Sequence, residues 1–168
     1  MNQSPSQPTR HSLELFSTQI SDEDIQLITN SLRRTYKDIL ELSIGGTLTL
    51  PPQAYNTPRN QYDAERLLHY LLRVKKQELA LWVIPKDLYT HGMNFIFGLA
   101  SHFYGAILSL HRLSTIDLKE KEAIHEIGHV LGLDHCTHSC VMQYSNSLGE
   151  AQQKPHTLCE HCKRTLSI

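Results

Sequence analysis

The residues best suited to chemistry lie between positions 125 and 140, where the sequence reads HEIGHVLGLDHCTHSC. His125 and His129 are four residues apart, so on an α-helix both imidazoles project from one face, one turn apart. Two such nitrogens can bind one Zn²⁺, and Glu126 beside them can take a proton from water that the metal activates. This spacing therefore predicts a zinc site that performs hydrolysis.

Gly132 and His135 extend the motif. A helix can end at Gly132 with positive φ, which glycine adopts without a Cβ penalty, and the chain can then turn to bring His135 up as a third ligand. Three protein ligands leave a fourth position open for water, as catalytic zinc sites require. The pattern is typical of metzincin-type zinc hydrolases, which place a methionine beneath the metal, and Met142 stands at a suitable distance along the chain.

All four cysteines lie close to the C-terminal end, at Cys136, Cys140, Cys159 and Cys162. They form C-x3-C and C-x2-C pairs, the spacing of a tetrahedral Cys₄ zinc site. The alternative is two disulfide bonds, which we regard as less favoured because nothing in the sequence indicates secretion. We therefore expect a second zinc ion, bound by the four thiolates.

The chain resembles the archaemetzincin family over nearly its whole length. The family's pattern is matched at a set of metal-ligand, glycine and methionine positions: His125, Glu126, His129, Gly132, Cys136, Cys140, Met142, Cys159 and Cys162. The segments 59–62, 87–89 and 94–98 also look like the family. Two spacers, between Cys136 and Cys140 and between Met142 and Cys159, are each one residue shorter than the family usually has.

The resemblance implies a zinc-dependent metallopeptidase that acts on peptides or proteins. One zinc would be catalytic, on His125, His129 and His135, with Glu126 as general base; the other would be structural. Tyr144, two residues after Met142, stands where some metzincins carry a tyrosine that binds zinc or the tetrahedral intermediate. The alternative role for Tyr144 is a buried aromatic packed under the site. The alternative function is a non-catalytic, zinc-stabilised module that binds proteins or peptides, although such a module has no need of Glu126.

Composition limits the partners and the compartment. The 168 residues carry a formal net charge of −1, with 16 basic and 17 acidic residues, so no nucleic-acid partner is indicated. No apolar run is long enough for a transmembrane helix, and the polar, Pro/Ser-rich residues 1–10 do not form a signal peptide. We expect a disordered tail there, a cytoplasmic location that keeps the thiols reduced, no membrane contact and a monomer.

The hydrophobic pattern predicts an α/β fold with a mixed, mostly parallel sheet, an antiparallel edge strand and helices packed on it. Strands are expected at 13–17, 47–50, 79–84, 95–100 and 103–110, and 103–110 is the expected edge strand along the cleft. Helices are expected from about 22 to 42, at 61–76 and at 115–131, with a short last helix from about 157. Ser21, with Asp24, is expected to cap the first of these, and Ser114, with Asp117, the third. We divide the domain into residues 11–132, which end with the active-site helix, and a small zinc-stabilised subdomain at 133–168.

Overall fold

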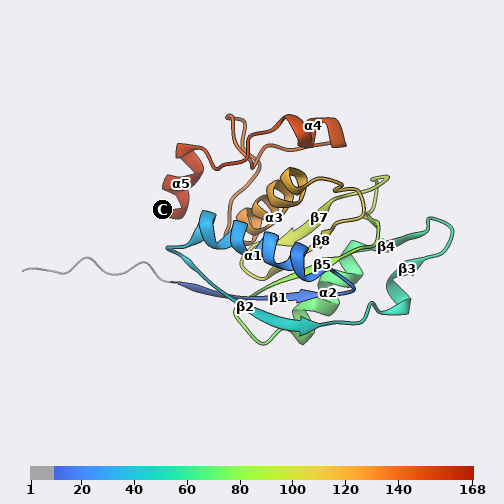
Figure 1. The fold of residues 1–168 in the computed structure, drawn as a ribbon. Helices are drawn as coiled ribbons and strands as arrows, with labels where there is room; N and C mark the ends of the chain where they lie inside the picture. Colours follow the sequence, from blue (N-terminus) through green and yellow to red (C-terminus); the bar gives the residue numbers. More distant parts are fainter. Residues whose placement is uncertain (1–9) are drawn as a thin grey trace, which may run out of the picture.

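The computed structural model describes residues 10–168, which form a five-stranded sheet with helices on both faces and a small three-stranded sheet beside it (Figure 1). Except for Arg10, the tail expected at residues 1–10 lies outside these described residues. None of the helices in the described part is long and apolar enough to cross a membrane.

The larger sheet is parallel except at one edge, as the hydrophobic pattern predicts. Four parallel strands are followed by one antiparallel strand, in the order β2 (Leu40–Thr47), β1 (His11–Ser17), β5 (Leu79–Ile84), β8 (Gly105–Ser109) and β7 (Gly98–Ser101). Strand β5 reads LALWVI, and all six of its residues are buried. A continuous apolar run of this kind suits a strand covered on both faces.

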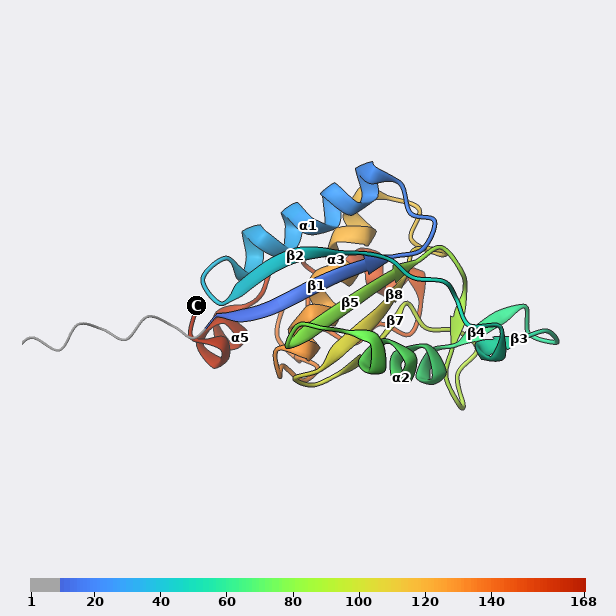
Figure 2. The same cartoon turned by 90° about the horizontal axis from the view of Figure 1, so that it is seen from below.

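Helices cover the two faces of this sheet separately, as Figure 2 shows. Helices α1 (Asp22–Tyr36) and α3 (Ile116–Val130) lie on one face, and α2 (Ala64–Val74) lies on the other. The side chain of Ser21 caps α1 by accepting a hydrogen bond from the Asp24 N–H, a common N-terminal signal. The face that carries α1 and α3 has the larger hydrophobic core, so α3, the helix that carries His125 and His129, is held by packing along its length.

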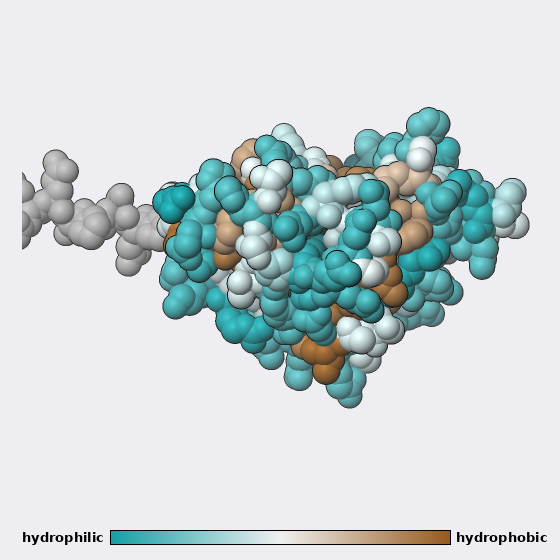
Figure 3. All heavy atoms as spheres, turned by 90° about the horizontal axis from the view of Figure 1, so that it is seen from above, coloured by the Kyte–Doolittle hydropathy of each residue, from teal (hydrophilic) through white to brown (hydrophobic). Residues whose placement is uncertain are grey.

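The small sheet consists of β3 (Tyr55–Asn56), β4 (Gln61–Asp63) and β6 (Leu88–Tyr89), and follows the 3₁₀ helix η1 (Pro52–Ala54). The C-terminal segment carries the short helices α4 (Leu148–Gln153) and α5 (Glu160–Leu166), and α4 lies over α3 (Figure 1). Buried residues of this segment share the core of α1 and α3; they include Cys140, Val141, Met142, Ala151 and Leu158. Seen from the side of this segment, the surface is mostly hydrophilic with small scattered apolar groups (Figure 3).

Two of the expected elements were wrong near the start of the chain. The first helix ends at Tyr36 rather than near position 42, and the chain returns as β2 over Leu40–Thr47, so the strand expected at 47–50 is absent. Ile39, Leu40 and Leu42 fit a helical repeat, but Leu40 and Leu42 are buried while Glu41 between them is exposed. That alternation is the repeat of a strand, and pairing with β1 decides between the two patterns.

Other boundaries also differ. The helix expected at 61–76 begins only at Ala64, because Gln61–Asp63 pairs as β4, and the final helix begins at Glu160. Thr115 rather than Ser114 caps α3, by accepting a hydrogen bond from the Leu118 N–H. The segment 103–110 is not the edge strand: β8 lies between β5 and β7, all five of its residues are buried, and β7 takes the edge.

Candidate metal centres

Helix α3 and the turn after it bring three histidines together. His125 and His129 lie one turn apart on α3, which ends before Gly132, where φ is +98°. The turn carries His135 back towards the helix, and one ring nitrogen from each histidine lies within 4.8 Å of the others. These are the three histidines that the sequence pattern selected, so helix periodicity and a glycine turn together build the cluster.

The hydrogen bonds around the histidines fit a metal ion. Nδ1 of His125 lies 2.9 Å from the carbonyl oxygen of Val141, and Nδ1 of His129 lies 2.7 Å from that of Leu133. Each Nδ1–H therefore donates to a carbonyl group, which leaves a lone pair on each Nε2. The two Nε2 atoms are only 3.0 Å apart. Two facing lone pairs repel unless a cation binds both, so the donor set suits zinc.

The charge state of the histidines supports the same conclusion. Burial lowers the pKa of His129 to about 4, and burial, together with the positive charge of Lys154, holds the pKa of His125 well below its ordinary value. Burial also lowers the pKa of His135. All three rings are therefore neutral at pH 7, the form that binds a metal ion.

Met142 lies beneath the helix, fully buried, at the level of Gly128. A Cβ atom on Gly128 would lie 2.9 Å from Cε of Met142 and would meet its sulfur atom as well. Because glycine at position 128 has no Cβ, the Met142 side chain can pack against the helix under the histidine cluster. The turn that contains Met142 also supplies Val141, whose carbonyl group accepts from His125.

Glu126 is buried beside the histidines, and its carboxyl group lines the same cleft. Burial and the negative charge of Glu122 raise its pKa to about 8, while the ammonium group of Lys154 acts in the opposite direction. Nζ of Lys154 lies 2.7 Å from Oε1 of Glu122, and both side chains are almost fully buried. Sequence patterns do not single out Glu122 or Lys154, because a carboxylate one turn before Glu126 is common on helices and Lys154 is distant in sequence.

The cleft has a volume of about 400 Å³. Its lining includes the three histidines, Glu126, residues of β7 and the segment before β7, and Tyr144. The ring of Tyr144 lies with its centroid 5.0 Å from that of His135, and its hydroxyl donates to Oδ1 of Asn146 at 2.7 Å. Tyr144 is 49% exposed, so it is an accessible residue at the cleft and not a buried aromatic under the site.

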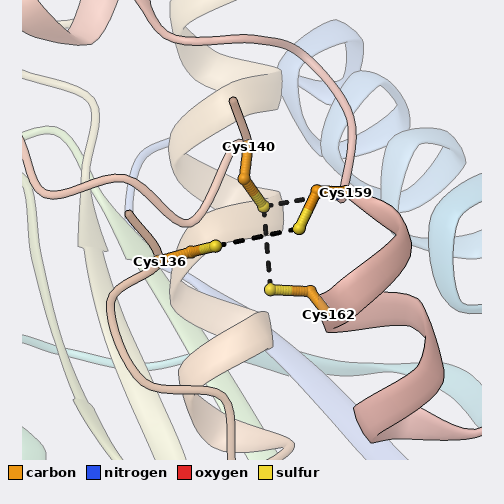
Figure 4. Close-up of side chains that lie close together, drawn as sticks. All are labelled: Cys136, Cys140, Cys159 and Cys162. Carbon is orange, nitrogen blue, oxygen red and sulfur yellow. Dashed lines mark hydrogen bonds between the residues drawn. The ribbon is translucent and has the colours of Figure 1, made fainter. Parts of the chain in front are cut away.

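The four cysteines form the second cluster (Figure 4). Sγ of Cys136 lies 3.7 Å from that of Cys159, and Sγ of Cys140 lies 3.7 Å from that of Cys162. All four thiols are free, and a tetrahedral site with Zn–S bonds of about 2.3 Å places sulfur atoms about 3.8 Å apart. The arrangement thus matches a zinc site rather than the alternative of two disulfide bonds.

Backbone N–H groups donate to two of these sulfur atoms, while burial raises the pKa of the Cys140 and Cys162 thiols. Sγ of Cys140 accepts hydrogen bonds from the N–H groups of Met142 at 3.4 Å and Cys159 at 3.3 Å. Burial opposes ionisation of Cys159, but hydrogen bonds from the Cys162 N–H and from neighbouring thiols lower its pKa to about 7. A thiolate at neutral pH is the form that binds zinc.

Comparisons with known proteins agree with this geometry. The family model for peptidase family M54 matches residues 39–167. An archaemetzincin from Nanoarchaeum equitans is 44% identical over 119 residues, which cover 71% of this chain and 70% of the relative. An archaemetzincin from Archaeoglobus fulgidus is 37% identical over 150 residues, which cover 85% of this chain and 91% of the relative.

Solved structures show the same similarity. The crystal structure of the Archaeoglobus fulgidus archaemetzincin complexed with malonate gives a TM-score of 0.81 at 33% identity, covering 91% of this chain and 98% of the other. The archaemetzincin from Methanopyrus kandleri gives a TM-score of 0.84 at 29% identity, covering 98% and 96%. With its fold, its histidine cluster and its family match, the chain belongs to the archaemetzincins, peptidase family M54, and is a zinc metallopeptidase.

Proposed function

We propose that this chain hydrolyses peptide bonds at the three-histidine cluster by a metzincin-type mechanism, with Glu126 as the general base. The observation that carries the proposal is the pair of Nε2 atoms of His125 and His129, 3.0 Å apart, in a cleft that Glu126 also lines. When bound, a zinc ion polarises the scissile carbonyl group, lowers the pKa of water towards 7 and favours the carboxylate form of Glu126.

The side chains of this protein then have separate tasks. The carboxylate of Glu126 accepts the proton of the attacking water and passes it to the leaving amine, so one group serves as base and then as acid. The carbonyl groups of Val141 and Leu133 hold the rings of His125 and His129 in orientation. The hydroxyl group of Tyr144, at the edge of the cleft beside His135, donates a hydrogen bond to the oxyanion of the tetrahedral intermediate.

Strand β7 supports an extended substrate. In the described part of the chain β7 pairs on one side only, with β8, and Gly98 and Leu99 line the cleft. An edge strand presents free N–H and C=O groups, which can pair with the backbone of a peptide. We assign to β7 the role that the sequence pattern had suggested for 103–110.

Two zinc ions per chain follow from the same proposal. One binds to His125, His129 and His135, and the other binds to Cys136, Cys140, Cys159 and Cys162. The thiolate site stabilises residues 133–168, which form a small subdomain on α3. So short a segment has few apolar residues of its own, and a structural metal supplies stability that its packing lacks.

Digestion of a peptide library by the zinc-loaded chain tests the function, with Glu126→Ala and Glu126→Gln as matched controls. We expect cleavage by the parent chain and a loss of at least about a hundredfold in both variants, because general-base catalysis contributes on that order. Equal cleavage by parent and variants, or none by any of them, would contradict the proposal. Tight peptide binding without cleavage would indicate the non-catalytic binding module instead.

A further inference from the structure

One wall of the cleft is apolar and lies outside the hydrolytic machinery. The segment 93–97 leads into β7, and it contributes Met93, Phe95, Ile96 and Phe97 to the lining of the cleft. Met93, Phe95 and Ile96 are only partly buried. Partly exposed apolar side chains in a binding cleft gain stability when an apolar group of a ligand covers them.

Two side chains hold the backbone of this wall from behind. One guanidinium nitrogen of Arg59 donates to the carbonyl oxygens of Met93 at 2.9 Å and Asn94 at 3.1 Å. Nε2 of Gln61 donates to the same carbonyl of Asn94 at 2.8 Å, and Nε of Arg59 donates to Oε1 of Gln61 at 2.9 Å. Backbone pairing also holds the segment, because the Ile96 N–H donates to the Leu88 carbonyl at 3.0 Å and the Ser109 N–H donates to the Phe97 carbonyl at 2.8 Å. The side chains of Arg59 and Gln61 add to this by fixing the end of the segment at Met93 and Asn94.

Asp87 and Arg112 complete the support. Nε2 of Gln61 also donates to Oδ2 of Asp87 at 2.9 Å. Arg112 makes a two-pronged contact with the same carboxylate, at 2.9 Å to Oδ1 and 2.8 Å to Oδ2. The guanidinium carbon of Arg112 lies 4.0 Å from the centroid of the Phe95 ring, so the arginine fixes the ring by a cation–π contact.

We call Arg59, Gln61, Asp87 and Arg112 the clamp. All four lie in the described part of the chain, and none of them lines the cleft. The planar fork of Arg112 is paired with Asp87, and the guanidinium of Arg59 lies 4.2 Å from the centroid of the Tyr89 ring. The contacts of the clamp with the cleft run through the wall, to the carbonyl groups of Met93 and Asn94 and to the ring of Phe95.

We propose that the clamp residues are positioning residues for the wall 93–97, and that the wall selects peptides with an apolar side chain opposite Met93 and Phe95. This inference rests on the proposed function, because it takes the cleft to be where the peptide binds. A clamped ring loses little further conformational freedom when it contacts a ligand, so a fixed wall favours binding more than a mobile one.

Binding of short peptides to the zinc-loaded Glu126→Gln chain tests the inference without turnover. The peptides share an alanine background with a single Leu or Asn moved along the sequence, so no register has to be assumed. At one position in the peptide, we expect the peptide with Leu to bind at least about tenfold more tightly than the peptide with Asn, which is the discrimination typical of an apolar pocket. Phe95→Ala should reduce this ratio to less than about twofold.

The clamp is tested by Arg112→Leu and by Gln61→Leu, each in the same background. Each variant should reduce the ratio of the affinities for the Leu and Asn peptides at least about threefold. In a chain that already carries Phe95→Ala, Arg112→Leu should not reduce this ratio further, because the ring that it holds is absent. In the parent chain with active Glu126, Arg112→Leu should raise KM and leave kcat within about twofold. Arg73→Leu, at an exposed arginine of α2, is the matched control and should leave both readouts unchanged.

A merely structural role for the clamp would lower the fraction of active protein and affect both peptides equally, leaving the ratio intact. The inference is overturned if no position prefers Leu, or if Phe95→Ala or both clamp variants leave the ratio as it was. Failure of the proposed function looks different, because it appears as no cleavage by the parent or as equal cleavage by Glu126→Gln. The binding ratio can be read in either case.

Discussion

A Cβ atom added to Gly98 would lie 2.6 Å from Cδ of Glu126 and 2.7 Å from its Oε1. The first residue of the edge strand β7 therefore lies directly against the carboxyl group that we propose as the general base. Real Cβ atoms do not approach other heavy atoms so closely, so only glycine at position 98 allows strand and carboxylate to adopt these positions together.

Gly98→Ala should displace the Glu126 carboxyl group and lower turnover at least about tenfold, or about 1.4 kcal/mol in the barrier. Zinc content should not change, because the histidine rings are held by Val141 and Leu133. The measurement is kcat on a cleaved peptide together with metal analysis. Gly149→Ala is the control, since a Cβ there meets nothing nearer than 3.8 Å. Undiminished turnover in Gly98→Ala would show that the contact is not used in catalysis.

His125→Ala and His129→Ala should each lose one zinc ion per chain and keep the ion bound by the four thiolates. The reason is that two imidazoles on one helix face and one from the turn form the site, and two ligands bind zinc far more weakly than three. Metal analysis of purified protein measures this directly. His69→Ala, at an exposed histidine of α2, should retain both ions. A ligand variant that keeps two zincs would refute the assignment.

Asp87→Asn should destabilise the chain by roughly 1–3 kcal/mol at pH 7, since it weakens charge-assisted hydrogen bonds to Arg112. Burial opposes ionisation of Asp87, but hydrogen bonds from Arg112 and Gln61 lower its pKa below 3.8. Below pH 3.8 the unfolded chain binds more protons at this carboxyl than the folded chain does, so acid removes the stabilisation. The difference in the free energy of unfolding between the parent and Asp87→Asn should be the same at pH 7 and pH 5, and it should shrink below about pH 4. Urea unfolding at matched zinc content measures it, and a difference that already falls between pH 7 and pH 5 would contradict the lowered pKa.

Tyr144→Phe should lower kcat at least about tenfold with little change in KM, because the hydroxyl group acts on the oxyanion and not on the bound substrate. The exposed position of Tyr144 beside His135 supports this role, since a hydroxyl at the cleft edge is not needed for packing. Steady-state kinetics on one peptide provide the test, with Tyr104→Phe as the control at another exposed tyrosine. Equal kcat values would leave Tyr144 with no part in the reaction.

The histidine cluster and the cysteine cluster could be predicted from the sequence because local rules bring their residues together. Helix periodicity sets His125 against His129, a glycine turn returns His135, and cysteine spacing reflects the geometry of a tetrahedral metal. Strand β5 could be predicted for a similar reason, because six consecutive apolar residues admit few other structures in a mixed fold.

Long-range pairing accounts for what the sequence did not reveal. Ile39, Leu40 and Leu42 suit either a helix or a strand, and the choice depends on β1, which lies more than twenty residues earlier. The edge strand was misplaced because the burial of β8 depends on β5 and β7 lying on its two sides. The contact between Lys154 and Glu122 likewise joins residues that no short motif connects.

The two metal sites share one stretch of backbone. His135 is covalently bonded to Cys136, the Cys136 N–H donates to the carbonyl of Met142 at 3.0 Å, and the Met142 N–H donates to Sγ of Cys140 at 3.4 Å. The carbonyl of Val141, beside Met142, in turn accepts from Nδ1 of His125. Under the proposed assignment, the loop that the thiolate site organises therefore supplies both a ligand and an orienting group to the histidine site.

Cys159→Ser should for this reason weaken zinc binding at the histidines at least about tenfold, besides abolishing it at the cysteines. A structural zinc site contributes roughly 10–16 kcal/mol of apparent binding free energy, against a total stability of about 5–15 kcal/mol for a domain. Its loss should free the loop from His135 onward and leave His125 and His129 on an intact helix without a third partner. Zinc stoichiometry and competition with a chelator measure both sites, and Ser139→Ala, at an exposed residue of the same loop, should retain both ions. If Cys159→Ser still binds one zinc through its histidines as tightly as the parent does, the cysteine site is an independent module and the shared loop does not couple the two metals.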